Sequence, residues 1–180
     1  MSAFEYKIVL LGSPCVGKST YINKLITGDF DTCYRATNGV DISQVNMETT
    51  SGNVKLNILD FAGQEMYCSH SYRKGHYFGV DAVIVMCDLI SKMSFTNSRY
   101  FVQEVQKFFE DKVPCFLVAN KSDCVDASIK ITDKMMQTEC RKQKYCDVIK
   151  ISTKTGEKIK QPLLSIIRLL KEDEKIDIIV

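Results

Sequence analysis

A glycine-rich stretch near the N-terminus contains residue types suited to holding phosphate. It reads Gly12-Ser13-Pro14-Cys15-Val16-Gly17-Lys18-Ser19, which follows the pattern G-x-x-x-x-G-K-[ST]. An apolar run precedes it and a helical pattern follows it, so backbone N–H groups and a helix N-terminus would point at one spot, where a polyphosphate can bind. Lys18 would reach the outer phosphates, and the Ser19 hydroxyl would take one Mg²⁺ position. The alternative is a glycine and proline turn with an unrelated lysine.

A second group of polar residues follows the alternating segment 54–59. It reads Asp60-Phe61-Ala62-Gly63-Gln64-Glu65. The Asp60 carboxylate can hold Mg²⁺ through its water shell, the Gly63 N–H can bond a γ-phosphate oxygen, and Gln64 can position an attacking water. Taken alone, an aspartate at this point is more often a turn or helix-cap residue, so the interpretation depends on the rest of the chain.

Two further polar groups could recognise a base. Asn120-Lys121-Ser122-Asp123 follows the apolar run 113–119, and Ser152-Thr153-Lys154 stands at the end of the short strand pattern 148–152. The Asp123 carboxylate can accept two N–H bonds from the edge of guanine, a pairing that adenine does not offer. Asn120 would support the base edge and the phosphate loop, and the Lys121 stem would lie along the base face. The backbone N–H of Thr153 could donate to guanine O6. As isolated motifs, both groups are also compatible with ordinary polar turns.

The elements that must position these groups alternate between strands and helices. Hydrophobic periodicity predicts strands at 4–11, 40–48, 54–59, 82–87, 113–119 and 148–152, and helices at 18–27, 94–109, 129–143 and 163–171. A hairpin turn at 49–53 joins the second and third strands. This order predicts an α/β fold, in which a six-stranded, mostly parallel sheet has one antiparallel edge strand and helices on both faces. In such sheets the ligand lies beyond the carboxyl ends of the strands, where all four polar groups stand.

The composition is that of an ordinary globular protein. The chain has 180 residues, which predicts one domain at 1–174 followed by a short C-terminal tail at 175–180. The net charge is only +2, from 24 basic and 22 acidic residues, which argues against nucleic acid as a partner. No apolar run approaches the ~20 residues of a membrane span, and the N-terminus lacks the features of a signal peptide. The eight cysteines include no C-x-x-C pair, so we expect reduced thiols in a cytoplasmic protein and no zinc site.

Taken together and in order, these motifs resemble those of the Ras superfamily of small GTPases over essentially the whole chain. Within it the chain looks most like the Rab family, because 37–42 is similar to the Rab segment T-I-G-V-D-F and 55–60 to K-L-Q-I-W-D. Tyr72-Arg73-Lys74-Gly75 and Ser94-Phe95 also have Rab-like counterparts. The resemblance implies a P-loop NTPase G domain that binds GTP and GDP with Mg²⁺, hydrolyses GTP slowly, and acts as a switch in vesicle trafficking.

The resemblance also implies roles for individual residues. Thr37 would complete the Mg²⁺ shell with Ser19 and Asp60, and Gln64, Lys18 and Thr37 would be the catalytic residues. Phe30 would lie edge-on against guanine, and Tyr34 would cover the phosphates. The full nucleotide-binding set would be Ser13, Pro14, Cys15, Val16, Gly17, Lys18, Ser19, Thr20, Phe30, Tyr34, Thr37, Gly63, Asn120, Lys121, Asp123, Ser152, Thr153 and Lys154.

Two loops would be the switches of such a protein, and partners would bind through them. An exchange factor, a GTPase-activating protein and effectors are expected to contact 30–42 and 61–79. Departures from the family pattern at Asn38, Leu59 and Phe61 affect this surface more than the nucleotide site.

Two other departures concern hydrolysis and membrane attachment. Pro14 and Cys15 replace small residues, and Pro14 has no N–H and would crowd the γ-phosphate. The alternative function is therefore a nucleotide-binding interaction module with impaired hydrolysis. A P-loop kinase is a weaker alternative, because it would leave Asn120 to Asp123 without a role.

The last cysteine is Cys146, so no lipid anchor is expected in this chain, and membrane recruitment would need a partner or a missing segment.

Overall fold

Six strands form one sheet in the computed structural model, which describes residues 4–30, 37, 39–62, 75–110, 112–124 and 129–179. The strand order is β2-β3-β1-β4-β5-β6, and every neighbouring pair is parallel except the antiparallel pair of β2 with β3. The strands are β1 (Phe4–Gly12), β2 (Val40–Thr49), β3 (Gly52–Phe61), β4 (Ala82–Asp88), β5 (Cys115–Asn120) and β6 (Asp147–Lys150). The predicted α/β sheet, with one antiparallel edge strand, is therefore confirmed.

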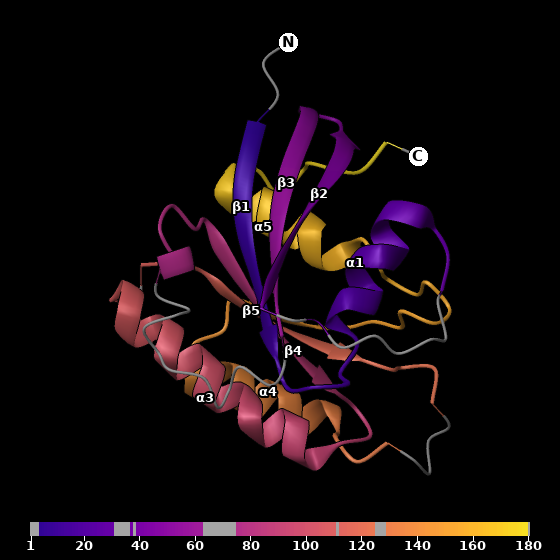
Figure 1. Cartoon of the computed structure of the whole chain (residues 1–180), viewed down its shortest axis with the longest axis vertical. Coiled ribbons are helices and arrows are strands. Elements are labelled where there is room, and N and C mark those ends of the chain that lie inside the picture. Colours follow the sequence, from indigo (N-terminus) through magenta and orange to yellow (C-terminus); the bar gives the residue numbers. More distant parts are fainter. Residues whose placement is uncertain are drawn as a thin grey trace.

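The helices of the described residues cover both faces of this sheet. They are α1 (Lys18–Thr27), α3 (Lys92–Phe109), α4 (Asp133–Gln143) and α5 (Gln161–Leu170). Figure 1 shows α3 and α4 together on one side of the sheet and α1 and α5 on the other. The proline predicted in the first turn of the last helix is there, at Pro162, where its missing N–H costs no helical hydrogen bond.

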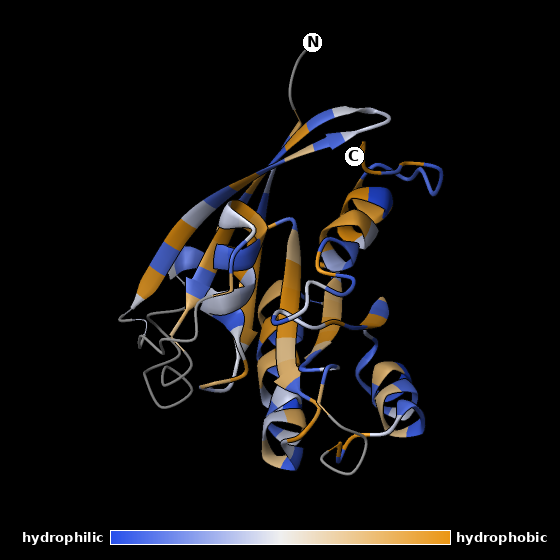
Figure 2. Ribbon diagram, turned by 90° about the vertical axis from the view of Figure 1, so that its right-hand side faces the viewer, coloured by the Kyte–Doolittle hydropathy of each residue, from blue (hydrophilic) through white to orange (hydrophobic). Residues whose placement is uncertain are grey.

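Alternation along the inner strands separates the core into two layers. Ile8 and Leu10 of β1 belong to the cluster that packs on α1 and α5, whereas Val9 and Leu11 belong to the cluster that packs on α3 and α4. Because successive side chains of a strand point to opposite faces, a strand covered on both faces must be apolar throughout. In Figure 2 the strands inside the molecule are orange along most of their length, whereas the helices alternate between orange and blue.

The start of α4 differs from the prediction, which placed it at residue 129. The helix begins at Asp133, because Thr132 is its N-cap and the Thr132 hydroxyl accepts from the Met135 N–H at 3.3 Å. The preceding residues are held in a different conformation, since the N–H groups of Lys130 and Ile131 both donate to the Leu89 carbonyl. A cap residue and a competing loop contact therefore move the helix start by four residues, which periodicity alone does not indicate.

The segment after α5 returns to the turn that joins β2 and β3. Ile176 is 1% exposed and belongs to the hydrophobic core. The Thr50 N–H donates to the Asp177 carbonyl and the Ile179 N–H donates to the Glu48 carbonyl, each at 2.9 Å. Residues 176–179 therefore lie on the hairpin, at the end of the sheet where Figure 1 also places the C-terminus.

Candidate functional site

The phosphate loop connects β1 to α1, and two of its glycines lie against other parts of the chain. Gly12 has φ +149°, and a Cβ on it would lie 2.3 Å from the Met86 carbonyl oxygen. Gly17 has φ +100°, and a Cβ on it would lie 2.4 Å from the Asn120 side-chain nitrogen. Both positions combine a positive φ with close approach of a neighbour, and only glycine meets both conditions. The loop thus packs closely against β4 and the end of β5.

Two carbonyl groups of this loop, those of Cys15 and Val16, are bound by side chains at the end of β5. The Asn120 amide donates to the Val16 carbonyl at 2.8 Å, and the Lys121 ammonium donates to the Cys15 carbonyl at 3.1 Å. Across a trans peptide the C=O and the next N–H point in opposite directions, so these contacts turn the N–H groups of Val16 and Gly17 to the other side. A row of N–H groups at the N-terminus of α1 is an anion site. Lys18 Nζ, meanwhile, donates to loop carbonyls at 2.8 Å and 3.1 Å.

Three oxygen-bearing side chains from distant parts of the chain meet beside this loop. The hydroxyls of Ser19 and Thr37 lie 2.8 Å apart, and the Ser19 hydroxyl also donates to the Asp60 carboxylate. Asp60 is 3% exposed, and its second oxygen, Oδ1, is buried without a hydrogen-bond partner among the described residues. Hydroxyl and carboxylate oxygens are the ligands that Mg²⁺ takes in proteins, and a buried carboxylate oxygen without a partner is suited to a cation.

The burial of Asp60 also affects the pKa of its carboxyl. Burial raises the pKa of its carboxyl above the ordinary value, against the opposing effects of the Ser19 hydroxyl and the Lys18 charge. A cation at this position would favour the charged carboxylate and reverse the shift. The residues present therefore fit a divalent metal ion, held by Ser19, Thr37 and Asp60 together with phosphate oxygens.

The predicted base-binding residues also come together. The Ser152 hydroxyl donates to Asp123 Oδ1 at 2.6 Å, which orients that carboxylate. Asn120 is fully buried, and its amide nitrogen donates to the Thr153 hydroxyl at 3.2 Å. The Thr153 N–H, predicted to donate to guanine O6, donates here to Asn120 Oδ1 at 3.1 Å. Thr153 thus holds Asn120 through both its backbone and its side chain, a contact that the sequence did not suggest.

The Ras family model matches residues 7–172 of the chain. The chain belongs to the Ras family. Its members are small GTPases, which act as molecular switches, bind GTP and GDP with Mg²⁺, and hydrolyse GTP. Partners of this Ras-family protein are accordingly guanine nucleotides and regulators of the kind typical of the family.

The other site residues predicted for this GTPase fall into three groups. Ser13 and Val16 are buried, and the Ser13 hydroxyl accepts from the Asn97 amide of α3 at 3.2 Å. Pro14, Cys15, Phe30 and Lys154 are exposed, and Thr20 is partly buried. Tyr34, Gly63 and Gln64 lie outside the described residues, as do Asn38 and most of both predicted switch loops.

Asp88 and Asn97 contact the GTPase site but were not predicted from the sequence. The Asp88 carboxylate forms an ion pair with Lys121. Asp88 directly follows the predicted strand 82–87, so the rule that placed Asp60 and Asn120 at strand ends would also have found it. Asn97 lies inside a helical pattern, and no sequence signal distinguishes it there.

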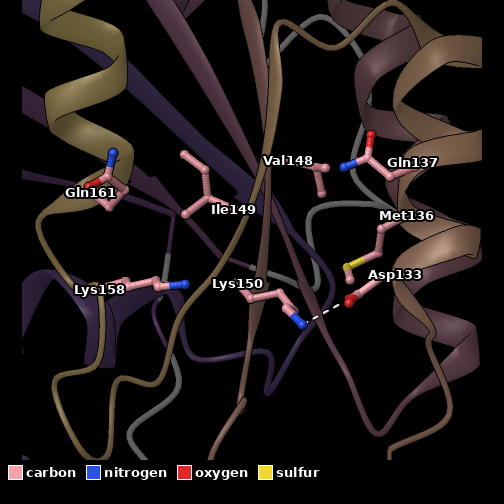
Figure 3. A pocket seen from close by; sticks show the side chains of 8 residues that line it. All are labelled: Asp133, Met136, Gln137, Val148, Ile149, Lys150, Lys158 and Gln161. Atoms are coloured by element: carbon pink, nitrogen blue, oxygen red, sulfur yellow. Dashed lines mark ion pairs between the residues drawn. The ribbon is translucent and has the colours of Figure 1, made fainter.

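A hollow of about 460 Å³ lies elsewhere on this Ras-family protein, between α4, β6 and the start of α5. Figure 3 shows Lys150 directed toward Asp133, with which it forms an ion pair at 2.8 Å. None of the residues lining this hollow belongs to the predicted nucleotide site.

Among the residues that the structure describes, no helix is long and apolar enough to cross a membrane.

Replacing Ser152 with alanine is expected to speed GDP dissociation from this GTPase about tenfold. The hydroxyl orients the Asp123 carboxylate, and a hydrogen bond to a charged group contributes roughly 1.5–3 kcal/mol, which partial exposure reduces. Dissociation of a fluorescent GDP measures the effect. Thr155→Ala removes a nearby exposed hydroxyl whose partner among the described residues is the Glu157 N–H, and it should leave the rate unchanged. Equal rates for the Ser152 variant and the original protein would contradict the assigned role.

Proposed function

We propose that this small GTPase is a Rab-like switch in vesicle trafficking, with slow intrinsic hydrolysis of GTP. The observation that carries the catalytic part is the convergence of Ser19, Thr37 and Asp60 beside the phosphate loop, with the Asp60 Oδ1 atom lacking a partner among the described residues. Thr37 belongs to the first predicted switch loop, so a metal ion held by Thr37 would connect that loop to the nucleotide.

The reaction attributed to the site is in-line attack of water on the γ-phosphorus. The new P–O bond forms as the bond to the bridging oxygen breaks, GDP leaves with that electron pair, and the proton of the water passes to phosphate oxygen. The loop N–H groups and Lys18 stabilise the negative charge on the phosphates. Mg²⁺ held by Ser19, Thr37 and Asp60 would neutralise negative charge on the phosphates. Gln64 is the predicted residue for orienting the water.

The Rab-like part of the proposal rests on the segments 37–42 and 55–60. Their ends lie side by side, because Asp41 and Ile42 of β2 pair with Asp60 and Leu59 of β3 in the antiparallel register. Ile42 is 69% exposed, whereas Leu59 is buried, so the outer strand offers an apolar side chain at the edge that effectors are expected to read. The proposed location is the cytoplasm, with recruitment to vesicles through a partner or a segment beyond this sequence.

Single-turnover phosphate release is the experiment that tests the catalytic proposal. The purified protein is loaded with GTP and followed with and without Mg²⁺. Steady release that needs Mg²⁺ and disappears in Gln64→Leu supports the working switch. Tight GTP binding without release over many hours overturns it, and supports the alternative of a nucleotide-binding interaction module.

A specific feature favours that alternative, namely the two unusual residues of the phosphate loop. Pro14 and Cys15 are both exposed, and Cys15 has φ +61°, in the left-handed region that non-glycine residues rarely adopt. The Pro14 ring stands on the loop that would face the γ-phosphate, so it could obstruct water or the arginine of an activating partner.

Pro14→Gly is expected to raise single-turnover hydrolysis about tenfold if the ring obstructs the attacking water, since positioning effects of this kind are worth about 10²-fold when complete. GDP dissociation of the same variant serves as a control for changes in the loop itself. Unchanged intrinsic and partner-stimulated rates would exclude an effect of Pro14 on hydrolysis.

The trafficking proposal needs a cellular test. A tagged Gln64→Leu protein and a tagged Ser19→Asn protein are compared in cells, because the former should favour the GTP state and the latter should lose the metal-ligating hydroxyl. Vesicle labelling by the first and diffuse labelling by the second supports the proposal. Labelling of another compartment by the first, with no vesicles, overturns it.

A further inference from the structure

Asp88 is a buried carboxylate to which the proposed reaction assigns no role. It is the last residue of β4 and is 5% exposed. In the register of β4 with β5 it pairs with Asn120, and its carboxylate forms an ion pair with the adjacent Lys121. A buried carboxylate is costly unless it is paired and hydrogen-bonded, so its partners indicate what it does.

The turn between β4 and α3 fixes this carboxylate in place. Its Oδ1 atom accepts the Ile90 N–H at 2.9 Å. The Asp88 N–H donates to the hydroxyl of Ser94 at 3.0 Å, and the Asp88 carbonyl accepts the Ser91 N–H at 3.0 Å. Ser91 is also the N-cap of α3, where its hydroxyl accepts the Ser94 N–H. The helix start therefore holds Asp88 rigidly, with its second oxygen left for Lys121.

Lys121 in turn connects Asp88 to the phosphate loop. Its ammonium lies between the Asp88 carboxylate and the Cys15 carbonyl, to which it donates at 3.1 Å. Lys121 has φ +69°, so its backbone turns sharply at the end of β5. A lysine side chain is long and flexible, and holding it in one rotamer costs conformational entropy. A fixed anion at its tip offsets that cost.

We propose that Asp88 is a positioning residue for the nucleotide, acting through Lys121. The ion pair holds the Lys121 stem along the predicted face of the base. It also keeps the ammonium on the Cys15 carbonyl, which turns the next N–H, that of Val16, toward the phosphates. The Asp88 carboxylate thus positions both the Lys121 stem beside the base and the Val16 N–H beside the phosphates. This inference rests on the proposed nucleotide site and adds a residue to it.

The competing explanation is that Asp88 only caps the turn before α3. The two explanations differ in what happens when Lys121 is absent. If Asp88 acts through Lys121, its loss has no further effect on nucleotide binding in a protein that already lacks Lys121. If Asp88 acts through the turn, its loss has the same effect with or without Lys121.

The test compares Asp88→Asn, Lys121→Met and the double variant, each in the full chain. Asparagine is close to aspartate in shape and can still accept the Ile90 N–H, so the turn is retained, which thermal unfolding checks. The matched control is Asp133→Asn, which removes a carboxylate that pairs with Lys150 on the exposed surface. The measurement is dissociation of fluorescent GDP in the presence of Mg²⁺.

We expect GDP dissociation to be about 10- to 100-fold faster in Asp88→Asn, as for the loss of one hydrogen-bonded charge. The rate should not change in Asp133→Asn, and the double variant should match Lys121→Met. An additive double variant, or an unchanged Asp88→Asn, overturns the inference. Failure of the original protein to bind GDP would instead overturn the proposed function, so the two failures are distinguishable.

Discussion

Replacement of Asp60 by asparagine is expected to lower single-turnover GTP hydrolysis at least about 100-fold and to remove the Mg²⁺ dependence of nucleotide dissociation. Asp60 is the carboxylate of the proposed metal site, and its buried Oδ1 atom lacks a hydrogen-bond partner among the described residues. Loss of a charge-stabilising contact in a site closed to water costs about 10²–10³ in rate. The measurements are phosphate release and GDP dissociation over a titration of Mg²⁺.

Asp41 provides the matched control for this experiment. It lies opposite Asp60 in the register of β2 with β3, is exposed, and contributes to raising the Asp60 pKa through its negative charge. Asp41→Asn therefore removes one negative charge nearby without removing a proposed metal ligand. It should keep the Mg²⁺ dependence. If both variants behaved alike, the effect would be one of general charge, and Asp60 would lose its role as a ligand.

Gly12→Ala is expected to lower the free energy of unfolding by about 2–5 kcal/mol. The new Cβ would lie 2.3 Å from the Met86 carbonyl oxygen, and φ is +149°. The colliding atom belongs to the backbone of β4, which is paired on both sides, so the clash cannot be relieved by a side-chain rotation. Overpacking costs typically 1–3 kcal/mol, and an unfavourable backbone conformation costs a similar amount. Urea unfolding at a fixed GDP concentration measures the change, because bound nucleotide adds to stability.

Gly28→Ala separates the two causes of the expected destabilisation, which are the steric clash and the left-handed backbone conformation. Gly28 has φ +78°, but a Cβ on it would meet no atom within 4 Å. This variant should therefore cost only the left-handed conformation, about 1–2 kcal/mol. A Gly12 variant no less stable than the Gly28 variant would show that the sheet adapts to the added atom, contrary to the geometry described above.

The strands were the most predictable part of the fold, and the reason is local. The runs 82–87 and 113–119 are apolar without interruption, and the structure places strands at Ala82–Asp88 and Cys115–Asn120. A strand covered on both faces has no other composition available. The start of α4 was predicted wrongly, because Lys130 and Ile131 are held by Leu89, which lies about forty residues earlier in the chain. Contacts of that kind leave no periodic signal.

The site was predictable where a motif has a fixed spacing and unpredictable where it depends on packing. Ser19 and Asp60 belong to recognisable motifs, and the structure brings them together. The contact of the Thr153 N–H with Asn120 depends on how two strand ends approach each other, and no residue pattern reports that. The roles of Tyr34, Gly63 and Gln64 stay predictions, because these residues lie outside the described part of the chain.

The segment 176–179 has a consequence for how the hairpin can move. Its hydrogen bonds hold Thr50 and Glu48 at one end of the β2–β3 hairpin, and Ile176 is anchored in the core. Sliding β2 along β3 by one residue would invert its side chains and break these bonds at the same time. The turn of the hairpin, at Glu48 and Thr50, is therefore the end that stays in place. Motion transmitted between Thr37 and Asp60 must then take the form of bending near the nucleotide rather than a shift of register.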